Sequence, residues 1–79
     1  MQIGDKVCFV LQSYELTSWW DNPYGVTYLY TFRDFFDNVY IWKTSRVIED
    51  NISKVSGRVK EFITYDGQQE IQLIYCKCS

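Results

Sequence analysis

The sequence contains no histidine, one proline and four glycines that stand far apart. Without an imidazole, the usual activation of a serine or cysteine nucleophile is unavailable. The separated glycines do not form a phosphate-binding loop. The carboxylates occur singly in turn-like segments, where aspartate is usually structural. We therefore predict a protein that is not an enzyme and that uses no cofactor.

Cysteines are few, and their number is odd: Cys8, Cys76 and Cys78. An odd number does not indicate a disulfide framework, and no histidine or pair of CxxC motifs completes a zinc site, so we predict no metal. Reduced thiols favour a cytoplasmic protein. The chain lacks a basic, apolar leader and a run of the roughly 20 apolar residues that cross a bilayer. No membrane partner is expected.

A strong basic excess is also missing, because the formal net charge is −2. A general nucleic-acid coat is usually strongly basic. The charge is uneven, however. Residues 1–42 contain two basic and five acidic side chains, whereas residues 43–79 contain six basic and five acidic ones. The positive charge is therefore concentrated in the second half of the chain.

What the sequence has in quantity is aromatic residues: three Trp, seven Tyr and five Phe in 79 residues. This length allows one domain, residues 1–79. A chain so short buries only about 60% of the surface that its unfolded form exposes. Large rings give much burial per residue, so we expect most of them to fill the core.

Five segments have the composition or alternation of β-strands, namely residues 6–14, 26–33, 39–44, 54–65 and 69–77. Asp34 to Asn38 and Asp66-Gly67 are typical of turns, and residues 17–25 are predicted to be a loop. Gly57 inside its strand indicates a bend. Residues 45–53 are the one place for a helical turn, with Ser45 as N-cap and Glu49 and Asp50 after it.

This pattern predicts an all-β fold, a five-stranded OB-fold-like Greek-key barrel. An SH3-like barrel, which also has about five strands, is the alternative. Strict alternation would place Phe62 on the same face as Lys54, Arg58 and Lys60. It would also place Tyr75 on the same face as Ile71 and Leu73.

Four stretches carry a family resemblance: Tyr24 to Phe32, Asp37 to Ser45, Gly57 to Phe62 and Tyr65 to Gly67. They resemble small OB-like domains of bacterial phage and mobile-element proteins, which often form the C-terminal part of longer chains. The resemblance covers most of the sequence and implies the barrel fold. It says little about function, for which an accessory role in phage or mobile-element DNA metabolism is one expectation.

Three positions depart from that family pattern. Phe62 replaces the usual His, Asp37-Asn38 lacks the glycine of the turn, and Tyr75 stands where Arg commonly precedes Cys76-Lys77. A role for the missing His or Arg is therefore not carried over to this chain.

Single-stranded nucleic-acid binding is the first functional hypothesis. Such binding needs cations along the phosphates and flat rings on which bases stack. The candidate residues, all in the predicted second to fourth strands, are Arg33, Tyr40, Trp42, Lys43, Lys54, Arg58, Lys60 and Phe62. The alternative is purely structural: the basic residues form a solvated outer face, and the rings belong to the core.

Protein binding is the second hypothesis, because Trp, Tyr and Arg dominate interface hot spots. Trp19, Trp20 and Tyr24 would form such a patch in the predicted loop. The exposed strand edges of a small barrel also allow a homodimer by strand pairing.

Overall fold

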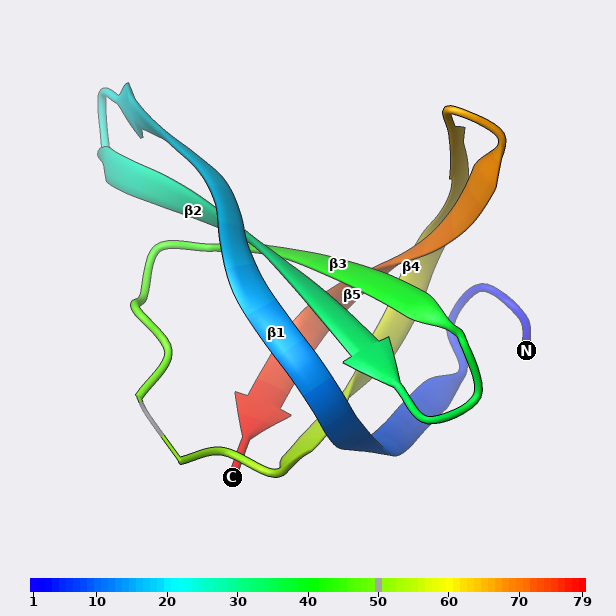
Figure 1. The fold of residues 1–79 in the computed structure, drawn as a ribbon. Helices are drawn as coiled ribbons and strands as arrows, with labels where there is room; N and C mark the ends of the chain where they lie inside the picture. Colours follow the sequence, from blue (N-terminus) through cyan, green and yellow to red (C-terminus); the bar gives the residue numbers. More distant parts are fainter. Residues whose placement is uncertain (50) are drawn as a thin grey trace.

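The structure is a computed structural model that describes residues 1–49 and 51–79. Its five strands are β1 (Lys6–Asn22), β2 (Gly25–Asp34), β3 (Val39–Thr44), β4 (Lys54–Tyr65) and β5 (Gln68–Cys78). They close into a ring in the order β1-β2-β3-β5-β4 (Figure 1). Neighbouring strands are antiparallel except β3 and β5, which are parallel over three residue pairs. The predicted all-β class and its five strands are confirmed.

β1 is longer than expected, because it runs through the segment predicted to be a loop. Trp19 pairs with Tyr28 and Trp20 pairs with Thr27, so the prediction of a tryptophan loop is wrong. Only the turn at Pro23 and Tyr24 is left between the strands. Two irregularities in the register bend β1, which lets its first part pair with β4 and its second part pair with β2.

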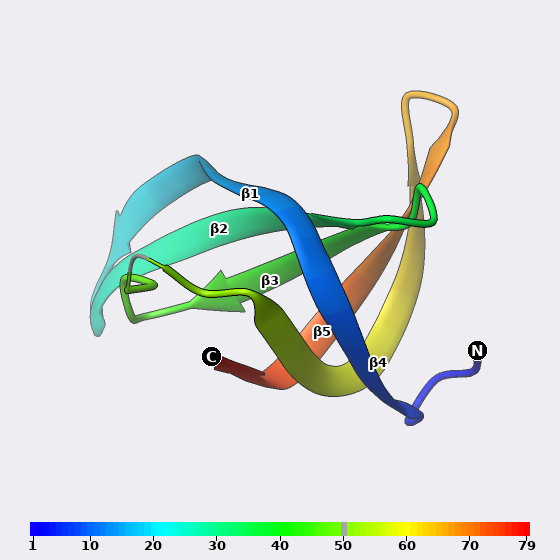
Figure 2. The same ribbon diagram turned by 60° about the horizontal axis from the view of Figure 1, so that its bottom comes forward.

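Two hairpins project from the ring, β1–β2 on one side and β4–β5 on the other (Figures 1 and 2). The β4–β5 turn is the predicted Asp66-Gly67, and both residues have positive φ (51° and 79°). A two-residue turn of this kind matches the twist of the strands that it joins.

The core fills the ring with one connected set of apolar side chains, whose most buried members are Phe32, Leu73, Val55 and Val59. Rings dominate it, as composition predicted. Phe32 is the centre, with Phe9, Tyr14, Tyr30 and Trp42 at ring-centroid distances of 6.3–6.5 Å. Such contacts stabilise beyond the burial of their area.

Two register shifts in the β4–β5 pair decide which side chains face out. One lies at the predicted bend, between Ser56 and Arg58. A Cβ atom on Gly57 would lie 2.9 Å from the Cys76 sulfur, so a larger residue there would force its neighbours to move. The other lies between Val59 and Glu61. The first adds a residue to β5 and the second adds a residue to β4, and each reverses the alternation of that strand beyond it.

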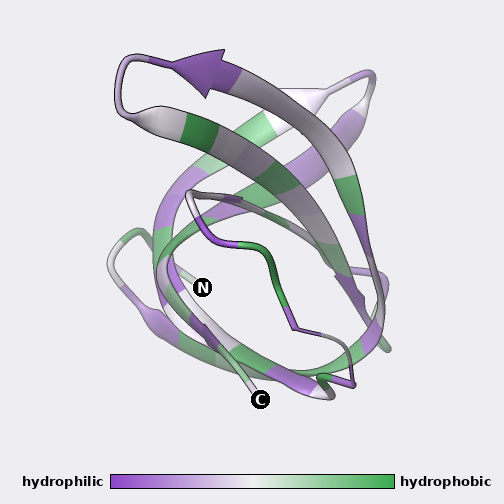
Figure 3. Cartoon of the chain, turned by 90° about the vertical axis from the view of Figure 1, so that its left-hand side faces the viewer, coloured by the Kyte–Doolittle hydropathy of each residue, from purple (hydrophilic) through white to green (hydrophobic). Residues whose placement is uncertain are grey.

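The segment after β3 contains no helix in its described part. In Figure 3, residues 45–49 cross the opening of the ring. Ile48 packs against the core, and its N–H donates to the Tyr30 hydroxyl at 3.1 Å. Asp50 lies outside the described residues. Over residues 1–49 and 51–79, no helix has the length and apolar character to cross a membrane.

Candidate nucleic-acid interface

Of the three rings predicted to stack on bases, Tyr40 is the most buried. It is 3% exposed and stacks on Phe9 with a centroid distance of 4.0 Å. Its hydroxyl donates to Asp34 Oδ2 at 3.0 Å. Burial, together with this carboxylate, raises the pKa of Tyr40. Its ring is therefore not available to a ligand, and the prediction of a stacking role is wrong.

Trp42 and Phe62 are half-buried and pack against the core. Phe62 was predicted to lie in line with the basic row of β4. The register shift after Val59 instead pairs Phe62 with the buried Ile71 and turns its ring inward. The predicted alignment of Phe62 with Arg58 is wrong for this reason.

The predicted cations are all exposed, but they lie on different parts of the ring. Arg33 is on β2 and Lys43 is on β3. β4 presents Lys54, Arg58 and Lys60. The predicted site is therefore divided, with its largest group of charges on β4.

The neighbours of β4 extend its basic row. Lys6 of β1 pairs with Arg58, and Lys77 of β5 pairs with Ser56. We call the resulting exposed set the cationic face: Lys6, Lys54, Arg58, Lys60 and Lys77. It holds five of the eight basic residues of the chain. Lys6 and Lys77 were missed because pairing between distant segments brings them to β4.

One exposed ring accompanies these charges. Tyr75 is 80% exposed, and it lines a hollow of about 180 Å³ with Lys6, Arg58 and Lys77. Strict alternation predicted Tyr75 on the core side. Its φ of 55° marks the irregular point of β5, after which Cys76 and Cys78 pack against the core in its place. The sequence signal for this reversal was the pair Cys76 and Cys78, two apolar residues spaced so that they share one face of β5.

Several acidic side chains lie in or beside the turns. The β1–β2 turn follows Asp21, the β2–β3 turn includes Asp37, and the β4–β5 turn includes Asp66. Asp5 and Glu61 adjoin the cationic face in sequence, and the Asp5 carboxylate accepts a hydrogen bond from the Gln2 N–H at 2.8 Å. The cationic face thus brings five cations together, with Asp5 and Glu61 as its neighbouring carboxylates in sequence, although the net charge is small.

The residues of the second hypothesis lie on the β1–β2 hairpin. Tyr24 is 98% exposed at its tip, Trp19 is 61% exposed and Trp20 is 40% exposed. Adjacent residues of a strand point to opposite faces. Trp19 is paired with Tyr28, whose ring packs against the core, so Trp20 lies on the outer face of the hairpin. The three rings therefore do not form one patch.

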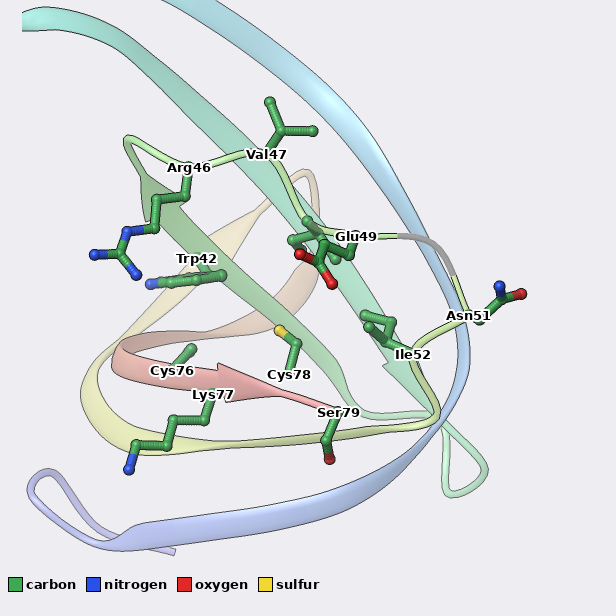
Figure 4. Close-up of a pocket in the computed structure, with 11 residues that line it drawn as sticks. Trp42, Arg46, Val47, Glu49, Asn51, Ile52, Cys76, Lys77, Cys78 and Ser79 are labelled. Atoms are coloured by element: carbon green, nitrogen blue, oxygen red, sulfur yellow. The ribbon is translucent and has the colours of Figure 1, made fainter.

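A pocket of about 540 Å³ lies between β3, β5 and the segment after β3 (Figure 4). Trp42, Arg46, Cys76 and Cys78 are among its lining residues. Burial, and to a lesser degree the charge of Cys78, raises the pKa of Cys76 to about 12. Burial also raises the pKa of Cys78. Both thiols stay protonated at neutral pH, and the pocket gains no nucleophile from them.

Compared with known proteins, the chain matches no family model, no curated protein and no solved structure. The candidate function therefore rests on the fold, the charge and the exposed rings.

Proposed function

We propose that this chain is an OB-type barrel that binds single-stranded nucleic acid on its cationic face. The OB type is a five-stranded, partly open Greek-key barrel. The ring of this chain has five strands, and only three residue pairs join β3 to β5. Since an SH3-like barrel also has about five strands, the short junction between β3 and β5 is the feature that supports the OB type.

The clustering of cations carries the functional proposal. Five cations on three adjacent strands create a local positive potential despite the net charge of −2. Phosphate backbones bind to such surfaces by releasing their counterions. The role is non-catalytic, and it is accessory to phage or mobile-element DNA metabolism.

Many OB barrels bind oligonucleotides on the face of strands 2 and 3 with the two flanking hairpins. Here that region offers Arg33 and Lys43, but its hairpins carry carboxylates at Asp21, Asp66 and Glu70. These charges repel phosphates. The cationic face on β1, β4 and β5 is therefore the better surface.

Two variants with the same net charge test this proposal. The first removes three charges from the cationic face through Lys54→Gln, Lys60→Gln and Lys77→Gln. The control removes three charges elsewhere through Arg33→Gln, Lys43→Gln and Arg46→Gln. Binding of a fluorescein-labelled dT oligomer of about 16 nucleotides, the upper site size of one OB fold, is measured by anisotropy at several salt concentrations.

We expect the first variant to lose most of its affinity at low salt. Each phosphate contact adds about 0.7 to the slope of log K against log salt, so the slope should fall by about 2. The control should stay close to the original protein. If the two variants lose affinity equally, or if the original protein does not bind at low salt, the proposal is wrong.

A second candidate function is protein binding through the β1–β2 hairpin. The high exposure of Trp19 and Tyr24 favours it, because such rings anchor interfaces. A homodimer is the simplest form. We expect Trp19→Ala to shift a dimer to a monomer in light scattering without unfolding. A protein that is monomeric at all concentrations would exclude the homodimer.

A further inference from the structure

The hollow beside Tyr75 differs from the rest of the cationic face, because a ring and three cations line the same space. Lys6, Arg58 and Lys77 come from β1, β4 and β5, and Ser56 and Gly57 complete the lining. In Figure 4 the Lys77 side chain extends away from Trp42. Tyr75 is 80% exposed and the three cations are exposed, so the ring and the charges face solvent.

Arg58 is held in place at this site. Its Nη1 donates to the Gly4 carbonyl at 3.1 Å. A guanidinium has five N–H donors in a fixed plane, so most of them stay free for a ligand. Planar donors next to two ammonium groups are suited to a phosphate.

Tyr75 is held in an unusual backbone conformation. Its φ of 55° lies in the left-handed region, which is a genuine outlier for a bulky residue. Because the side chain is 80% exposed, its own burial gives little compensation. Glycine would adopt the same backbone without a steric cost. Strain of this kind clusters at sites that bind ligands.

We propose that the hollow holds one phosphate of a single-stranded nucleic acid between Lys6, Arg58 and Lys77, and that the Tyr75 ring stacks on the adjacent base. This inference rests on the proposed function and deepens it. The left-handed backbone at Tyr75 places its ring on the outside of the barrel. Regular alternation along β5 would instead have turned the ring toward the core.

The first part of the test needs no nucleic acid. Tyr75→Gly relieves the left-handed strain but makes the unfolded chain more flexible, so we expect the Tm to rise by roughly 2–6 °C. The control is Tyr65→Gly, since Tyr65 is also exposed (71%) but lies in the regular end of β4. That variant should melt at a lower temperature. A lower Tm for Tyr75→Gly would contradict the strain.

The second part measures binding of a dT oligomer and of an abasic oligomer of equal length. Loss of a stacking ring weakens binding by about tenfold per base. Tyr75→Gly should lose that factor with dT and almost nothing with the abasic oligomer, while Tyr75→Phe and Tyr65→Gly should bind dT like the original protein.

The outcomes separate the two proposals. If the original protein binds neither oligomer, both the proposed function and this inference are wrong. If it binds dT, but Tyr75→Gly binds dT equally well, only the stacking role of Tyr75 is overturned. An equal loss of affinity for both oligomers would also overturn the stacking role, because an abasic oligomer has no base on which Tyr75 could stack. Binding of inorganic phosphate alone at this site, with no affinity for dT, would overturn the choice of ligand.

Discussion

Replacing the buried carboxylate at the β2–β3 turn should destabilise the barrel in a pH-dependent way. Asp34 Oδ1 accepts hydrogen bonds from the N–H groups of Phe36 (2.9 Å) and Asn38 (3.0 Å). Its Oδ2 accepts from the Asn38 side-chain amide at 2.9 Å and from the Tyr40 hydroxyl at 3.0 Å. One side chain thus holds both the turn and a core tyrosine.

The variant Asp34→Asn keeps one acceptor oxygen for the two backbone groups. It presents an NH2 group to the other two donors. Hydrogen bonds to a charged group contribute about 1.5–3 kcal/mol, and neutral ones about 1 kcal/mol. Because a neutral amide is also easier to bury, we expect a net loss of about 2 kcal/mol in the free energy of unfolding. For a domain of this size that lowers the Tm by about 8–16 °C.

The pH dependence follows from the pKa of Asp34. Burial, the largest single influence, raises this pKa, but the hydrogen bonds from Asn38, Phe36 and Tyr40 together lower it below the usual value. A lowered pKa in the folded state means that the carboxylate contributes its stability above the unfolded pKa of about 3.9. This contribution is lost as the pH falls toward the folded pKa. The gap between the original protein and Asp34→Asn should therefore be constant from pH 7 to about 5 and should narrow below about 4.

Urea unfolding followed by tryptophan fluorescence at each pH measures this gap. The control is Asp37→Asn in the same turn. Asp37 is exposed with a φ of 64°, which asparagine also tolerates, so its change should stay within about 0.5 kcal/mol. A gap for Asp34→Asn that equals the control, or one that does not change with pH, would refute the role given to the buried carboxylate.

Three further predictions concern other contacts. Gly57→Ala should lower the free energy of unfolding by about 1–3 kcal/mol in urea titrations, because its Cβ would meet the Cys76 sulfur at 2.9 Å. Adding Cys76→Ala to the same chain should restore part of the lost free energy. If it restores none, this clash is excluded. The hydroxyls of Thr17 and Thr31 lie 2.6 Å apart. A double-mutant cycle of Thr→Val changes should give a coupling free energy of about 1 kcal/mol. If the two losses of stability are additive, the hydrogen bond is contradicted. At pH 8 a thiol reagent should modify the exposed Cys8 before Cys76, whose pKa is about 12. Modification of Cys76 at the same rate as Cys8 would contradict the burial of Cys76.

The sequence predicted much of the fold, because alternation and turn residues are local signals. The bounds of β3 and β4 were predicted to the residue, and Asp66-Gly67 was recognised as a tight turn. The end of β1 was missed because the Asn-Pro-Tyr-Gly stretch indicated a loop over residues 17–25. Cross-strand pairing of Trp19 and Trp20 with β2 outweighed that signal, and it depends on residues that are distant in sequence.

The candidate site was harder to predict than the strands. The basic row of β4 is a local pattern, and its side chains are exposed as alternation implied. Lys6 and Lys77 join it only through the closure of the ring. Tyr40 looked like a possible stacking ring because nothing in its neighbourhood encodes the Asp34 contact that fixes it inside. Sequence reasoning therefore identified the charges but not the ring that lies with them.

Alternation predicted the wrong face for two rings, Phe62 and Tyr75. Irregularities in one pair of strands, β4 and β5, account for both. The shift in β4 moves Phe62 from the basic row to the core, and the reversal in β5 moves Tyr75 from the core row to the basic row. Phe62 gains burial by this exchange. Tyr75 gains exposure and takes on a left-handed backbone. Packing alone explains the first change but not the second, because an exposed ring returns little hydrophobic stabilisation for its strain. The unfavourable backbone thus falls on the ring that faces solvent beside three cations, which is the distribution expected when that ring contacts a ligand.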